Sequence, residues 1–74
     1  MEACMKVEVV VGVSGCVGGD CPTIYRTDRG TFVVQGNRLN PAEVSQLHVP
    51  EHEILAEIPE TLVRSLASKL AGGL

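Results

Sequence analysis

Four side chains in this sequence are of the types that bind zinc. Cys16 and Cys21 have four residues between them, and His48 and His52 have three. Two thiolates and two imidazoles complete a tetrahedral zinc shell, and zinc binding adds folding free energy to a small domain. Against this, 26 residues separate the two pairs, whereas zinc fingers typically have about 12–15. We therefore expect free thiols and solvated histidines, and keep a zinc-stabilised binding module as the alternative.

The sequence gives less support to phosphate binding, to a reactive thiol and to catalysis than to zinc binding. Gly12, Gly15 and Gly18 follow a strand-like run, but a phosphate loop needs a helix next, and the residues that follow, CPTIY, are typical of a strand. Cys21 precedes Pro22, yet nothing in its sequence context indicates a lowered thiol pKa. No Ser/His/acid or Cys/His arrangement is apparent. We expect a protein that is not an enzyme and has no cofactor.

The charge pattern favours protein association over nucleic-acid binding. The net charge is −3, and phosphate binding draws its affinity from lysine and arginine. Three arginines lie close together within residues 26–38. Five glutamates then follow Arg38 before the next lysine or arginine. Complementary patches of this kind suit contact with another protein. The arginines are Arg26, Arg29 and Arg38, and the glutamates are Glu43, Glu51, Glu53, Glu57 and Glu60.

The first half of the chain predicts a strand and a hairpin. KVEVVVGV, residues 6–13, alternates so that Val7, Val9, Val11 and Val13 share one side. A glycine-rich loop follows. TIYRT and TFVVQ then flank DRG, in which Gly30 supplies the left-handed residue of a three-residue hairpin loop. We also expect the Asp28 side chain to accept a hydrogen bond from the turn backbone.

The register of this hairpin makes both of its faces apolar. Arg26 lies opposite Phe32, and Tyr25 lies opposite Val33, so the two aromatic rings point to different faces and form no common stacking platform. Ile24 lies on the same face as Phe32. A hairpin that is apolar on two sides needs to be covered on two sides.

The second half predicts a short helix, a strand and a longer helix. Asn40 caps a helix with Pro41 at its first position and Glu43 in a capping box, ending by Leu47. Residues 53–58 alternate as a strand with Ile54, Ala56 and Ile58 inward, and Pro59 opens a helix that Gly72 and Gly73 terminate. The apolar stripe of this last helix contains Leu62, Leu66 and Leu70. We predict one α+β domain over residues 1–74, with a mainly antiparallel sheet made of the central hairpin and two further strands.

The cellular compartment is inferred from the number of cysteines and from the length of the apolar runs. Three cysteines cannot all pair within one chain, which favours a reducing compartment. VSGC at residues 13–16 imitates the end of a lipoprotein signal, but the apolar run before it is short and contains Glu8. No run approaches the roughly 20 apolar residues of a membrane helix. We expect a cytoplasmic protein.

Residues 21–36, CPTIYRTDRGTFVVQG, carry a resemblance to small actinobacterial proteins of unassigned function. Their shared pattern is CP-x-[IV]-Y-x-T-[DE]-x-G-[ST]-[FYL]-V-V-Q-G, then an acidic strand ending in [IV]P-x-x-[LIV]. The likeness covers residues 21–70, the signature-bearing core. It implies an accessory partner of helix-turn-helix regulators of development that acts through protein contacts, and it implies no catalytic residue.

The sequence thus predicts a small interaction module that forms a homodimer and modulates a transcription regulator. A chain of 74 residues buries only about 60% of its unfolded surface, so a partner subunit would add needed stability. The second apolar face of the hairpin is the expected interface. Its residues are Tyr25, Phe32 and Val33 for packing, and Arg26 and Arg29 for polar contact.

Overall fold

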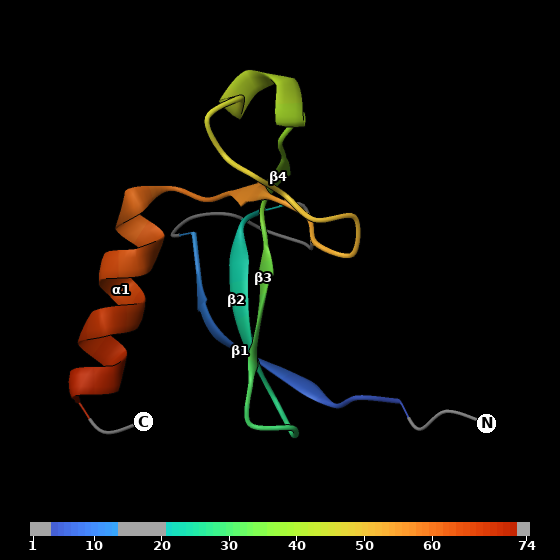
Figure 1. Cartoon of the computed structure of the whole chain (residues 1–74). Helices are drawn as coiled ribbons and strands as arrows, with labels where there is room; N and C mark the ends of the chain where they lie inside the picture. The colour runs from blue at the N-terminus through green and yellow to red at the C-terminus, as the bar shows by residue number, and fades with distance from the viewer. Residues whose placement is uncertain (1–3, 14–20, 73–74) are drawn as a thin grey trace.

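The computed structural model describes residues 4–13 and 21–72, and they form a small α+β fold (Figure 1). An antiparallel three-stranded sheet has the order β1-β2-β3, and a second, two-stranded sheet pairs β4 with β5. No helix in these ranges is both long and apolar enough to cross a membrane. The elements are β1 (Val7–Gly12), β2 (Thr23–Thr27), β3 (Phe32–Gln35), β4 (Asn37–Arg38), the 3-10 helix η1 (Pro41–Val44), β5 (Ala56–Glu57) and α1 (Glu60–Ala71).

Strand β1 forms as predicted, but its valines do not share one side. The pairing with β2 shifts between Val9 and Val11, which is a β-bulge. A bulge inserts an extra residue and bends the strand. As a result Val10 and Val11 are both buried, while Val7 and Val9 are exposed. The prediction that Val7 and Val9 lie on the same side as Val11 is therefore wrong, because strict alternation ends at the bulge.

The hairpin of β2 and β3 has the predicted register. Tyr25 pairs with Val33, Arg26 pairs with Phe32, and Gly30 has φ 78°, the left-handed conformation that the loop requires. Thr27, rather than Asp28, accepts the turn hydrogen bonds. Its Oγ1 accepts from the backbone N–H groups of residues 29 and 31, at 3.1 and 3.2 Å. Thr27 is buried, and these bonds give its hydroxyl the partners that a buried polar group needs.

Helix α1 lies against β1 (Figure 1), and together they enclose the core. The predicted boundaries are confirmed, since Pro59 is the N-cap and Gly72 the C-cap. Among the described residues, the core has four buried apolar side chains, those of Val10, Val11, Ile24 and Leu62, with Ile58 and Leu66 packed against them in part. Ile24 and Leu62 are each 2% exposed. Leu70, at the far end of the stripe, is exposed.

Residues 37–57 form an arm that projects from the end of the sheet (Figure 1). The predicted capping box at Asn40 and Glu43 is present, but the element it starts is a single 3-10 turn that ends at Val44. The predicted strand over residues 53–58 is reduced to β5, whose residues Ala56 and Glu57 pair with β4. The Ile54 side chain is 87% exposed, so its predicted inward position is wrong.

The arm meets the sheet at Gly36. A Cβ atom at this position would lie 2.5 Å from the carbonyl oxygen of Glu57 and 2.7 Å from Cγ2 of Ile58. Both distances are too short for a real side chain, so glycine lets the backbone at the end of β5 lie directly against the residue that follows β3. This contact fixes where the arm leaves the sheet.

Candidate interaction surface

One face of the three-stranded sheet is open, and we call it the open face, defined by Val7, Val9, Tyr25 and Val33. Cross-strand partners lie on the same side of a sheet, and Tyr25 is the partner of both Val9 and Val33. Ile24, the neighbour of Tyr25, is in the core under α1, so Tyr25 points away from the helix. Val9 is 63% exposed, Val7 49% and Val33 36%.

A small polar network borders the open face. The Tyr25 hydroxyl donates to Oε1 of Gln35 at 3.0 Å, and Nε2 of Gln35 donates to the carbonyl oxygen of Cys21 at 3.1 Å. The Thr23 hydroxyl donates to the same carbonyl at 2.8 Å. These bonds hold the tyrosine ring in one position. A ring that is already ordered loses less conformational entropy when another surface packs on it.

The five predicted interface residues lie in three places. Tyr25 and Val33 are on the open face. Arg26 and Phe32 are on the opposite face of the sheet, where the guanidinium carbon lies 5.8 Å from the centre of the ring. Arg29 is exposed in the hairpin turn. Val7 and Val9, which complete the open face, were assigned to the covered side by the sequence pattern, and no sequence signal marked the bulge that exposes them.

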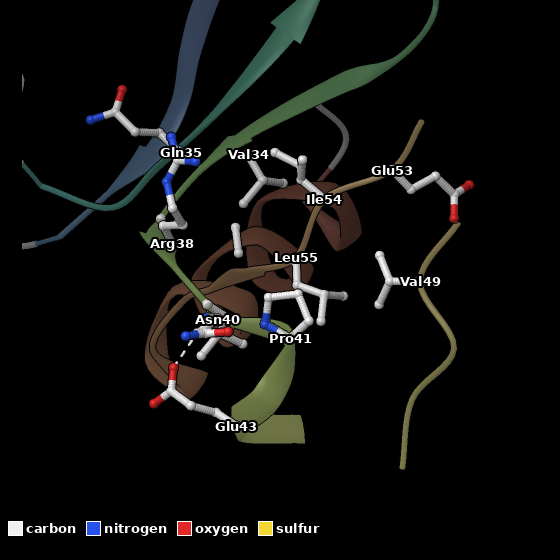
Figure 2. A pocket seen from close by; sticks show the side chains of 13 residues that line it. Val34, Gln35, Arg38, Asn40, Pro41, Glu43, Val49, Glu53, Ile54 and Leu55 are labelled. Carbon is white, nitrogen blue, oxygen red and sulfur yellow. Dashed lines mark hydrogen bonds between the residues drawn. The ribbon is translucent and has the colours of Figure 1, made fainter. Parts of the chain in front are cut away.

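A second hollow, the arm groove, lies where β3 meets the arm. Its volume is about 640 Å³. Val34 and Ile54 both line the groove, together with Leu55, Pro41 and Val49 (Figure 2). Polar groups stand at its margins, namely Gln35, Arg38, Asn40, Glu43 and Glu53. The arm groove is thus an apolar trough whose polar border contains two glutamates, one arginine and two amide side chains.

The four candidate zinc ligands are not assembled among the described residues. Cys21 is disulfide-bonded, so it is not the free thiol that we expected. His48 and His52 are both exposed on the arm. Within residues 4–13 and 21–72, no group of three or more His, Cys, Asp and Glu side chains is placed to hold a metal ion. Cys16 lies outside these ranges, and the zinc alternative stays a prediction.

The exposed thiol in the described ranges is that of Cys4. It lies before β1, apart from the open face and the arm groove. The open face and the arm groove offer apolar and charged side chains for contact with another molecule. Neither of them brings together a nucleophile and a base. Comparison with protein-family models, with curated proteins and with solved structures finds no match to this chain.

Proposed function

We propose that this protein is a non-enzymatic interaction module that forms a homodimer through the open face of its sheet. The observation that supports the proposal most is the contrast between a core of four buried apolar side chains and an apolar sheet face left exposed. A sheet with two apolar faces is stable when both are covered. Helix α1 covers the part of one face that contains Val11 and Ile24, while Phe32 and Val34 on that same face stay 43% and 44% exposed. A second copy of the chain would cover the other face.

The accessible area agrees with this assignment. A compact monomer of 7.8 kDa would expose about 4,400 Å², whereas this chain exposes 6052 Å². The excess is at most about 1,700 Å². Each subunit of a standard dimer contributes about 800 Å² to the interface. A second copy that covered the open face would remove part of this excess.

The composition of the open face also suits a protein interface. Interface centres are depleted in charged residues and enriched in tyrosine. The open face has three valines around Tyr25, and its hydroxyl already has a partner in Gln35. Arg29, at the hairpin tip, stands at its border, where charge steers association and adds little affinity.

We extend the proposal to the partner. The resemblance of residues 21–36 to accessory proteins of developmental regulators supports a role in which the dimer binds a helix-turn-helix regulator of an actinobacterium. The acidic stretch that includes Glu51, Glu53 and Glu57 supports the same role, since DNA-binding proteins are basic. Co-purification of a tagged chain with such a regulator would test this extension.

The test of the dimer uses Val9→Lys. Val9 is well exposed in the single chain, so lysine is tolerated there, but it would bury a charge in the proposed interface. We expect the wild-type chain to sediment as a dimer at about 50 µM and the variant as a monomer, because a dimer of standard size falls near micromolar affinity or tighter. The measurement is analytical ultracentrifugation over a dilution series.

The matched control is Val63→Lys, which makes the same change at a half-exposed position on α1. It should sediment like the wild type. A compact wild-type monomer at the highest concentration, or a Val9→Lys variant that remains dimeric, would show that the open face is not a dimer interface.

A further inference from the structure

The arm groove presents apolar side chains that the fold itself does not need. Ile54 is 87% exposed, and Val34 is 44% exposed. Neither belongs to the buried cluster that holds the sheet to α1. A soluble chain gains no stability from an isoleucine in water, and exposed apolar groups that gather in a hollow mark a binding site for another molecule.

The groove is held in shape by backbone contacts. The β4–β5 pairing forms its floor, extended by the hydrogen bond from Leu39 N–H to the Leu55 carbonyl oxygen at 3.4 Å. The capping box fixes one wall, where the Asn40 side chain accepts from the Ala42 N–H at 3.0 Å and Glu43 accepts from the Asn40 N–H at 3.1 Å. A preformed wall and floor lower the entropy cost of binding.

Charge decides which kind of occupant fits. From Val34 to Ile58 the chain has four glutamates and a single arginine, Arg38, which equals the whole net charge of −3. Glu43, Glu53 and Arg38 line the groove itself, so the charged residues of its lining sum to −1. A net negative border around an apolar trough attracts cationic side chains and repels anionic ones.

We propose that the arm groove binds a partner protein through a segment whose apolar side chains are flanked by lysine or arginine. The apolar side chains lie against Val34, Ile54 and Leu55, and the cationic ones reach Glu43 and Glu53. Its volume of about 640 Å³ lies within the roughly 300–1,000 Å³ of ordinary ligand pockets. This site is separate from the open face, so the inference deepens the proposed function without depending on the dimer.

The test uses a fluorescein-labelled amphipathic peptide of leucine and lysine, long enough for about three helical turns. A second peptide replaces every lysine with glutamate and keeps the leucines. Fluorescence anisotropy with the full chain should give saturable binding of the lysine peptide. The glutamate peptide should bind at least tenfold more weakly, which corresponds to a difference of about 1.4 kcal/mol in binding free energy. Equal binding of both peptides, or binding of neither, overturns the proposal.

Two matched variants locate the site. Ile54→Ser should weaken binding of the lysine peptide at least tenfold, because the bound peptide would no longer bury an isoleucine side chain. Val9→Ser, on the open face, should leave the affinity unchanged. The reverse pattern would place the peptide on the open face and overturn the proposal. Circular dichroism of both variants checks that the fold is retained.

A second copy of the chain is the competing occupant. If dilution alone, without peptide, changes the amide NMR shifts of residues 34–56, then the groove is filled by self-association and the proposal is overturned. Shifts in these residues should instead follow peptide addition. Should the chain sediment as a monomer and still bind the lysine peptide in an Ile54-dependent way, the dimer proposal fails while this one stands.

Discussion

The body of the molecule, made of β1, β2, β3 and α1, and the arm, residues 37–57, are held together by different interactions. The body has a buried cluster that includes Ile24 and Leu62. No residue of the arm is buried. The arm depends instead on short-range backbone hydrogen bonds, such as Leu47 N–H to the Val44 carbonyl at 3.0 Å and Glu53 N–H to the Pro50 carbonyl at 3.0 Å.

This difference separates the part that supplies stability from the part that presents a surface. Apolar burial is the dominant stabilising contribution, so the free energy of unfolding resides mainly in the body. Segments with few buried contacts open locally at low cost, and binding sites are drawn from them. The apolar side chains of the arm stay accessible because they are not packed into a core.

The largest effect is expected for Ile24→Ala in the body. Ile24 is 2% exposed and lies at the centre of the cluster. Loss of a buried isoleucine side chain costs about 2–5 kcal/mol, out of a total of about 4–11 kcal/mol for a chain of this length. The variant should be largely unfolded, or its urea unfolding midpoint should fall strongly. Circular dichroism measures both.

Val63→Ala is the matched control, because Val63 is half-exposed on α1. Its effect should remain within about 0.5 kcal/mol. If Ile24→Ala cost no more than this control, the buried cluster would not be the source of stability, and the contrast between body and arm would be lost.

Features with a local cause could be predicted from the sequence. The DRG turn depends on Gly30, which adopts the left-handed backbone conformation with φ 78°. The capping box depends on Asn40 and Glu43, three residues apart. Helix α1 depends on a four-residue apolar repeat ended by glycine. In each of them the interacting groups are neighbours in the chain, so spacing is sufficient.

Features set by tertiary packing could not be predicted. Residues 53–58 alternate like a strand, but only Ala56 and Glu57 have a partner strand, so Ile54 stays exposed. The bulge in β1 arises from its pairing with β2, and it moves Val9 from the expected inner side to the open face. Both candidate surfaces contain one of these misassigned residues. The interacting partner, and not the residue itself, decides which side is buried.

The next effect concerns the junction of the two regions, at Gly36. A Cβ there would overlap the Glu57 carbonyl and the Ile58 side chain, so Gly36→Ala should cost about 1–3 kcal/mol through displaced backbone. Gly30→Ala meets no atom within 4 Å and suffers from its positive φ alone, at about 1–2 kcal/mol. Urea unfolding of both variants measures these losses.

Asparagine distinguishes the two causes. Asparagine adopts the left-handed conformation more readily than alanine, so Gly30→Asn should recover part of the loss. Gly36→Asn should recover none, because the overlap comes from lack of space. Equal recovery at both sites would mean that Gly36 does not set the position of the arm.

The smallest effect is expected for Asn40→Ala, and it should be confined to the arm. The Asn40 side chain accepts from the Ala42 N–H at 3.0 Å in an exposed setting, and loss of such a cap costs about 0.5–2 kcal/mol of local stability. Amide hydrogen exchange near η1 and β5 should accelerate by roughly fivefold for about 1 kcal/mol. Exchange in β2 should stay as in the wild type, because Ile24 and its neighbours do not depend on the arm. A fall in the protection of β2 equal to that of the arm would show that the chain unfolds as one cooperative unit, in which case the arm could not open independently to admit a partner segment.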